Sequence, residues 1–251
     1  MINTSLGKIL LAVLLTTSLG ACGSRQRSAP LSPDALYERG MTAFQAGNHS
    51  RAVQSLESFL QRSPADTRAA RARYTVGEAR LARREHLLAA GDFTRVLNDF
   101  PQDPLGQKAR FGLCEAYRAL SPRPELDQQY TASAIAYCES FAGLFPASPD
   151  ASRASAWVAD MERKLAEKGY NAGFFYFRRG AYDAGVIYFT QVLENYQRTE
   201  FAPRALLRLM ESYERIGYEE EAEEARTRLV RDFPESPEAR SLPQPGAEPQ
   251  G

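Results

Sequence analysis

The sequence predicts an all-α protein, built as a solenoid of five helix-turn-helix repeats with one long helix before the fourth repeat. Five segments share one frame, in which an amphipathic helix ends, a proline follows and a short polar turn leads into the next helix: "FLQRSPADTRA", "VLNDFPQDPLG", "FAGLFPASPDA", "VLENYQRTEFA" and "LVRDFPESPEA". The prolines are Pro64, Pro101, Pro146 and Pro234, and Gln197 replaces the proline in the fourth segment. Successive spacings of 37, 45, 51 and 37 residues give a base period of 37 with 8 and 14 extra residues in the two long copies.

Residues 1–21 have the pattern of a secretory signal peptide, with a positive charge at Lys8 and an apolar run over 9–15. That run is too short to span a membrane, which takes about 20 apolar residues. Leu19-Gly20-Ala21-Cys22 resembles the bacterial lipoprotein signal, which implies cleavage before Cys22 and a lipid anchor on its thiol. The alternative is an ordinary signal peptide cut after residue 21. Because Gly23 rather than Asp follows the cysteine, the resemblance places the protein at the outer membrane, facing the periplasm.

The first repeat shows how each copy is organised. Its first helix runs from residue 33 to about Ala46 and ends at Gly47, and its second helix has an inward face of Ala52, Leu56 and Phe59. Glycines stand at the same turn in later copies, where the residue after a helix end often needs a positive φ: Gly180 and Gly217. Small residues recur where two helices approach closely: Ala52, Ala89, Ala134, Gly185 and Ala222.

This frame resembles the tetratricopeptide repeat, which has a small residue at its eighth position, Ala at the twentieth, a large residue at the twenty-fourth and Pro at the thirty-second. Gly40, Ala52, Leu56 and Pro64 match it in the first copy. The resemblance covers residues 33–239 in five copies, each about three residues longer than the usual 34. It implies helix pairs whose first helices line a concave groove, and a binding function, since repeats leave a long surface free.

The two insertions divide the chain. Eight extra residues lie in "LSPRPELDQQY", where Pro122 and Pro124 exclude a continuous helix. Fourteen extra residues before the fourth copy predict a helix from about Ser152 to Arg179, because they add close to four turns. The predicted organisation is then a lipidated linker, a front block of three repeats, a rear block of the long helix and two repeats, and a disordered Pro- and Gly-rich tail: 22–32, 33–150, 151–239 and 240–251.

An aromatic ladder is the main candidate binding site. Tyr37, Tyr74 and Phe111 follow one another at 37-residue intervals, each as the fifth residue of a first helix, and Met41 and Phe44 share the face of the first copy. We expect an extended peptide to lie across these rings, because aromatic side chains give a large contact area at low entropic cost. The alternative is that the rings pack between neighbouring helices and are part of the core.

Nothing in the sequence indicates catalysis. No metal-binding, nucleotide-binding or nucleophile motif is present, so no enzyme activity and no cofactor or metal site is predicted. Lys and Arg balance Asp and Glu at 31 each, so no basic field favours nucleic acid. Cys114 and Cys138 hold the eighth and twenty-fourth positions of the third copy, where either a disulfide or two buried free thiols would fit.

The stretches "LYERGMTAFQAGNHSRAVQSLESFL" and "AEKGYNAGFFYFRRGAYDAGVIYFTQVLENY" resemble the BamD family of outer-membrane protein assembly factors. The resemblance implies a non-enzymatic scaffold of the β-barrel assembly machine, together with other assembly lipoproteins. Its front repeats would receive unfolded barrel proteins, and its rear block would dock the periplasmic domains of the barrel-forming subunit. The rear aromatic residues assigned to docking are Tyr170, Phe174, Phe177 and Tyr182. A cell-envelope coordinator or a pilotin-like lipoprotein that binds another envelope partner is the alternative.

Overall fold

The structure, a computed structural model, describes residues 30–243. This part of the chain forms eleven helices and, within it, no strand. Of two compact units, the first, residues 1–32, is described only at its last three residues, and the second, from residue 33 onward, holds all the helices below. The repeats are α2 (Pro33–Gln45) with α3 (His49–Arg62), α4 (Ala69–Ala82) with α5 (His86–Asp99), α6 (Leu105–Leu120) with α7 (Gln129–Leu144), α8 (Ala151–Phe177) with α9 (Tyr182–Asn195), and α10 (Phe201–Ile216) with α11 (Glu219–Asp232).

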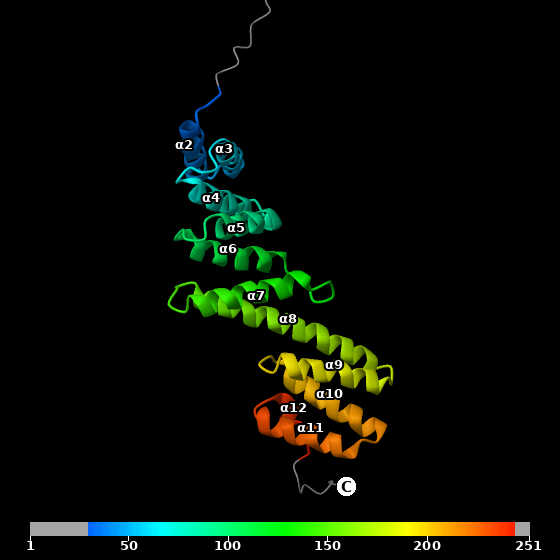
Figure 1. The fold of residues 1–251 in the computed structure, drawn as a ribbon. Coiled ribbons are helices and arrows are strands. Elements are labelled where there is room, and N and C mark those ends of the chain that lie inside the picture. The colour runs from blue at the N-terminus through cyan, green and yellow to red at the C-terminus, as the bar shows by residue number, and fades with distance from the viewer. Residues whose placement is uncertain (1–29, 244–251) are drawn as a thin grey trace, which may run out of the picture. The chain divides into compact units, whose positions relative to one another are not determined.

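Consecutive helices pack side by side, so each repeat covers its neighbour (Figure 1). This is the tetratricopeptide-repeat solenoid that the sequence predicts, and α8, with 27 residues, is the long helix before the fourth repeat. The small residues that recur in the frame are buried at the helix crossings: Ala52, Ala89, Ala134, Gly185 and Ala222. Four clusters of buried side chains follow one another along the helices, as expected for a fold in which each repeat contacts only its neighbours.

The turn inside four of the five repeats contains a left-handed residue. Gly47, Gly180 and Gly217 have φ angles of 73°, 75° and 83°, which glycine adopts without a Cβ clash. The second copy places Arg84 there, with φ at 62°. In the third copy the insertion replaces this turn, and Ser121 has an extended conformation. The predicted role of the glycines is confirmed, and the second copy is the exception.

The turn between repeats is also built alike in every copy. The residue two places after the frame proline donates its backbone N–H to the carbonyl three residues earlier, as in Asp66 to Ser63 (3.2 Å) and Ser148 to Phe145 (2.9 Å). Its side chain often accepts the N–H two or three residues later, as Asp103 does from Leu105 (2.8 Å). Thr199 makes the same bond to Tyr196 (3.1 Å), so Gln197 changes the residue but not the turn.

The eighth and twenty-fourth frame positions face each other in the core. A Cβ at Gly40 would lie 2.5 Å from Leu56 Cγ, and Cβ atoms at Gly77 and Gly173 would meet Phe93 and Phe189 at 2.7 and 2.6 Å. The small residue therefore makes room for the large one. In the third copy the same pair of positions is Cys114 and Cys138, whose Cα atoms are 4.7 Å apart and whose sulfurs form a disulfide.

Both insertions have the predicted kind of structure. Residues 121–128 form an irregular loop between α6 and α7, and the 14 extra residues extend α8.

After α11 a short helix, α12 (Pro237–Arg240), packs on the last repeat, and Pro243 O accepts a hydrogen bond from Arg226 (3.1 Å). Residues 244–251, most of the tail predicted to be disordered, lie outside the described residues, as does the predicted signal peptide.

Candidate functional site

The three rings of the predicted ladder lie on equivalent faces but differ in burial. Each contacts a buried phenylalanine from the second helix of its own repeat, with ring centroids 5.2 Å apart for Tyr37–Phe59, 5.6 Å for Tyr74–Phe93 and 5.0 Å for Phe111–Phe141. Tyr37 and Tyr74 are half-buried, whereas Phe111 is only 8% exposed. The frame therefore gives the ladder its regular spacing, and each ring has its own degree of access.

The burial of Phe111 comes from outside the periodic frame. Trp157 of α8 stacks on Phe111 with centroids 5.4 Å apart, and the Arg153 guanidinium lies 4.6 Å above the same ring. Arg118 in turn covers Trp157 at 4.2 Å. Phe111 thus belongs to the core cluster of the third repeat. Of the two interpretations of the ladder, exposure in a groove or packing in the core, core packing describes Phe111 better.

Tyr74 and Phe111 nevertheless open onto one hollow of about 470 Å³. It lies between α4, α6 and the turn that leads into α8. The second and third repeats therefore share this hollow, whereas Tyr37 of the first repeat does not line it. The lining combines rings with charges of both signs: Tyr74, Glu78, Pro104, Gln107, Lys108, Phe111, Glu115, Phe141, Ser148, Pro149, Asp150 and Arg153.

The polar groups of this hollow are only partly paired. Tyr74 donates its hydroxyl to Glu78 Oε1 (3.1 Å), and Arg153 pairs with Asp150 (2.6 Å). Burial raises the pKa of Glu78, and it raises the pKa of Tyr74 as well, so the phenol stays protonated and keeps donating. Lys108 forms no ion pair with any carboxylate in residues 30–243. The hollow can thus offer ring surface, a free cation and carboxylates to a bound segment.

The first-repeat residues of the ladder are half-buried and lie beside charges that are paired within the chain. Arg68 lies 4.8 Å above the Tyr37 ring and pairs with Asp34 (2.6 Å) and Asp66 (2.8 Å). The hydrogen bonds from Arg68 lower the pKa of Asp66 to about 2. The other two predicted residues, Met41 and Phe44, pack at the edge of the core cluster of the first repeat. This end of the ladder therefore has its charges already satisfied within the chain.

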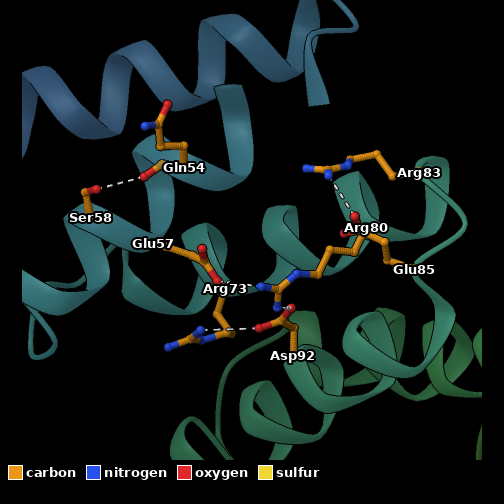
Figure 2. A network of polar contacts seen from close by, with 8 residues as sticks. All are labelled: Gln54, Glu57, Ser58, Arg73, Arg80, Arg83, Glu85 and Asp92. Carbon is orange, nitrogen blue, oxygen red and sulfur yellow. Dashed lines mark hydrogen bonds and ion pairs between the residues drawn. The ribbon is translucent and has the colours of Figure 1, made fainter. Parts of the chain in front are cut away.

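A buried ion network holds α4, which carries Tyr74. Arg73 and Arg80 of α4 both bind the carboxylate of Asp92 on α5, and Arg80 also binds Glu57 on α3 at 2.5 Å (Figure 2). Asp92 is 1% exposed. Burial raises the pKa of Asp92 and the two arginines oppose that rise. The network ties three helices together next to the ladder, and sequence reasoning missed it, because Asp92 stands at a position that is apolar or uncharged in the other copies.

The rear aromatic residues form one continuous row. Ring centroids are 6.0 Å apart for Tyr170–Phe174, 6.3 Å for Phe174–Phe177 and 5.4 Å for Phe177–Tyr182. All four are half-buried. Arg208 of α10 lies 5.4 Å from both Phe174 and Phe177. The row is therefore packed against the rear block from one side and open on the other.

A second hollow beside this row contains residues that sequence reasoning missed. It has a volume of about 540 Å³ and is lined by Asn171, Phe174, Phe175, Arg178 and Arg179. Phe175 is 48% exposed, with the Arg179 guanidinium 3.5 Å from its centroid. The signal was present in the run "FFYFRRG", where aromatic residues on every face of a helix cannot all be buried.

The predicted lipidation site, Cys22, is outside the described residues. No helix within residues 30–243 is both long and apolar enough to cross a membrane. In the same range, no group of three or more His, Cys, Asp or Glu side chains is placed to hold a metal ion.

Curated relatives of the chain share one description. It is 28% identical over 250 residues to an outer membrane protein assembly factor BamD of Neisseria meningitidis serogroup B, covering 92% of each chain. It is 27% identical over 228 residues to the BamD of Caulobacter vibrioides, covering 89% of this chain and 75% of the relative. Rickettsia prowazekii BamD is 25% identical over 236 residues, 92% of this chain and 93% of the relative.

The solved structures that align with the chain include two whose names refer to TPR repeats. A TPR repeats protein from Bacteroides fragilis has a TM-score of 0.45 at 15% identity, over 84% of this chain and 96% of that one. The TPR domain of P58(IPK) has a TM-score of 0.44 at 15% identity, over 82% and 53%. The family model YfiO, described as outer membrane lipoprotein, matches residues 30–229. The chain belongs to the YfiO family of outer membrane lipoproteins.

Proposed function

We propose that this chain is a lipid-anchored, periplasmic scaffold of the outer-membrane β-barrel assembly complex, held at the membrane through Cys22. Its front block receives unfolded barrel proteins, and its rear block docks the barrel-forming subunit and, with it, the other assembly lipoproteins. Family membership and the names of the curated relatives support a role in outer-membrane protein assembly. The division of labour between the two blocks is the finer part of the proposal.

The observation that carries the front-block role is the shared hollow of Tyr74 and Phe111. Two successive repeats contribute to it, so an extended segment that follows the repeats can contact both. Half-buried Tyr74 offers a ring face, and the unpaired Lys108 offers a cation to a carboxylate of the segment. Unfolded barrel proteins supply such segments, because their strands alternate apolar and polar side chains and carry aromatic residues at both membrane interfaces.

The rear-block role is supported by the aromatic row and the hollow beside it. Exposed rings flanked by arginines are the residue types enriched at the centres of protein interfaces. Phe175 is largely exposed in the isolated chain, so docking would remove its apolar surface from water.

Site-specific photo-crosslinking in cells tests both halves. A photoreactive residue at Gln107, which lines the front hollow, is expected to capture unfolded barrel proteins. The same residue at Asn171, which lines the rear hollow, is expected to capture the barrel-forming subunit. Glu214, an exposed residue of α10 outside both hollows, is the control and should capture neither. Capture of barrel precursors from Glu214 as efficiently as from Gln107 would contradict the front-block assignment.

Co-purification from mild detergent separates the proposal from its alternative. The proposal expects the barrel-forming subunit to remain bound to the full-length protein, and Phe175→Ala to reduce its recovery. A cell-envelope coordinator or a pilotin-like lipoprotein would instead bring down a different envelope partner. Recovery of such a partner without any barrel-assembly subunit would overturn the proposal.

A further inference from the structure

Two neighbouring core clusters, that of the third repeat and that of the last two repeats, meet inside one helix. In α8, Val158 and Met161 belong to the core cluster of the third repeat, and Ala166 belongs to the cluster of the last two repeats. Among the described helices, α8 is the one that packs against both α7 and α9, and neither α6 nor α7 packs against α9 or α10. Residues 161–166 therefore form the only described helical connection between the front repeats and the remainder of the rear block.

The loop of the third copy is attached to α8 at this junction. Lys164 Nζ donates to Ser121 Oγ (2.7 Å), and Lys168 Nζ donates to the carbonyl of Leu126 (2.5 Å). We call loop 121–128 and these two lysines the brace. It joins the two insertions, because the loop is the 8-residue insertion and the two lysines lie in the extended helix. Among residues 30–243 the chain has three lysines, and two of them serve the brace.

The brace loop has internal hydrogen bonds that keep its shape. The Gln128 side-chain amide donates to the carbonyls of Arg123 (2.7 Å) and Leu126 (3.0 Å). Thr131 donates to Gln128 Oε1 (2.7 Å), and its hydroxyl lies 2.6 Å from that of Ser121. A loop fixed in this way presents its acceptors to the two lysines at set positions, so it can resist movement of α8.

The opposite side of α8 is open. A hollow of about 390 Å³ lies there, lined by α7, α8 and the turn between α9 and α10: Glu139, Ala142, Ser155, Val158, Ala159, Glu162, Arg198 and Thr199. Ser155 and Glu162 come nine and two residues before Lys164, which places them about half a turn away from it around a helix of 3.6 residues per turn. The junction thus has contacts on one side and space on the other.

We propose that residues 161–166 of α8 act as a hinge between the front repeats and the part of the rear block that follows, and that the brace holds this hinge in one position. Release of Lys164 and Lys168 lets the rear block move towards the hollow on the opposite side. Burial lowers the pKa of the half-buried Lys164, and Arg118 and Arg163 add to that effect, while its ammonium group donates to the Ser121 hydroxyl. The inference concerns motion and stands whether or not the front hollow binds peptides.

Distances between spin labels test the hinge in the full-length protein. The labels are attached through a ketone-bearing non-natural amino acid, which leaves the cysteines untouched, at exposed Gln54 on α3 and exposed Gln191 on α9. In Lys164→Met/Lys168→Met we expect the width of the distance distribution to grow at least about twofold, as for a released domain hinge. The control Lys108→Met removes the third lysine and should leave the width unchanged.

A second label pair distinguishes hinge motion from general loosening. Labels at Gln54 and at exposed Arg95 on α5 both lie in the front block, so their distribution should stay as narrow as in the wild type. Lys164→Arg/Lys168→Arg keeps both donors and should also stay narrow. If the double methionine variant does not fold, Lys168→Met alone removes only an exposed contact and should broaden the front-to-rear distribution in part. A wild-type width, or equal broadening within the front block, would overturn the proposal.

Discussion

The front and rear blocks are stabilised by different chemistry although they share one repeat frame. The front block contains the buried Asp92 network and the Cys114–Cys138 disulfide. The rear block, residues 151–239, contains neither. Rings stack in both blocks, as Tyr176 and Tyr188 do at 5.5 Å in the rear and Tyr117 and Tyr137 do at 4.9 Å in the front, so the network and the disulfide are what distinguish the front block. The frame thus fixes where helices cross, and each repeat then fills the crossing with its own residues. We expect the stability of the front block, and not that of the rear block, to depend on charge and on oxidation.

The same difference applies to the ladder position. Tyr74 faces a hollow with unpaired charge, whereas its rear equivalent Tyr170 is surrounded by Phe174, Phe189 and Phe201 at about 6 Å or less. One frame position therefore contacts a cavity in one repeat and a packed cluster in another. The neighbours from the following helices decide which, so a binding site cannot be inferred from the periodicity of a ring alone.

The largest expected effect is on the buried network. Asp92→Ala removes the buried carboxylate that the half-buried Arg73 and Arg80 share, and leaves Arg80 with Glu57 alone. We expect a loss of about 3–5 kcal/mol in the free energy of unfolding, measured with urea. Asp183→Ala in the rear block, at the exposed start of α9, should change it by less than about 0.5 kcal/mol. Equal small effects from both substitutions would show that the network does not stabilise the front block.

The disulfide gives the next largest effect. Replacing Cys114 and Cys138 with alanine opens a loop with a sequence separation of 24 residues, and we expect a loss of about 3 kcal/mol. Cys114→Gly/Cys138→Leu copies the pair of Gly40 and Leu56 from the first repeat and should recover part of that loss. Unfolding curves of both variants, and of the wild type with and without reductant, measure these losses. If the Gly/Leu pair is no more stable than the alanine pair, the two frame positions are not equivalent.

Removing a ring of the rear block should reduce stability by less, and reductant should not change that loss. Phe174→Ala removes a half-buried ring, so we expect a loss of about 2 kcal/mol, below the 3–5 kcal/mol typical of a fully buried phenylalanine. The measured loss should be the same with reduced and oxidised protein. A loss that depends on the disulfide would mean that the two blocks unfold as one unit through this contact.

The smallest expected effect concerns backbone strain. Arg84 adopts the left-handed conformation that glycine adopts in the equivalent turns of other repeats. Arg84→Gly should therefore stabilise the protein by about 1 kcal/mol, because left-handed geometry costs a residue with a side chain roughly 1–2 kcal/mol and glycine loses some entropy. The mirror substitution Gly217→Arg should destabilise by a similar amount. Thermal unfolding should show a higher melting temperature for Arg84→Gly and a lower one for Gly217→Arg.

The repeat frame predicts most of the fold. It correctly placed the small residues at helix crossings, the glycines at the left-handed turns and the long helix before the fourth repeat. Arg84 was not predicted because arginine gives no sign of positive φ, and the fold imposes that conformation through its neighbours. The turn at Gln197 is preserved because backbone hydrogen bonds and Thr199 define it, and proline only favours it.

The candidate site was predicted less completely than the fold. Spacing identified Tyr74 and Phe111 as neighbours, and the structure places both at one hollow. It could not predict that Trp157 and Arg153 bury Phe111, because those residues come from the insertion in α8 and have no counterpart in the frame. The brace was missed for the same reason, since Lys164 and Ser121 are 43 residues apart and no periodic pattern links them.

The front hollow is proposed to bind extended segments through Tyr74. Titration of the purified protein with a peptide that ends in an aromatic residue measures this most directly. Tyr74→Ala should weaken binding by about 5–30-fold, the equivalent of about 1–2 kcal/mol, while Tyr74→Phe, which keeps the ring and loses the bond to Glu78, should weaken it by less than about threefold. Tyr170→Ala in the rear block should leave the affinity unchanged. Unchanged affinity in Tyr74→Ala, or an equal loss in Tyr170→Ala, would show that the front hollow does not bind the peptide through Tyr74.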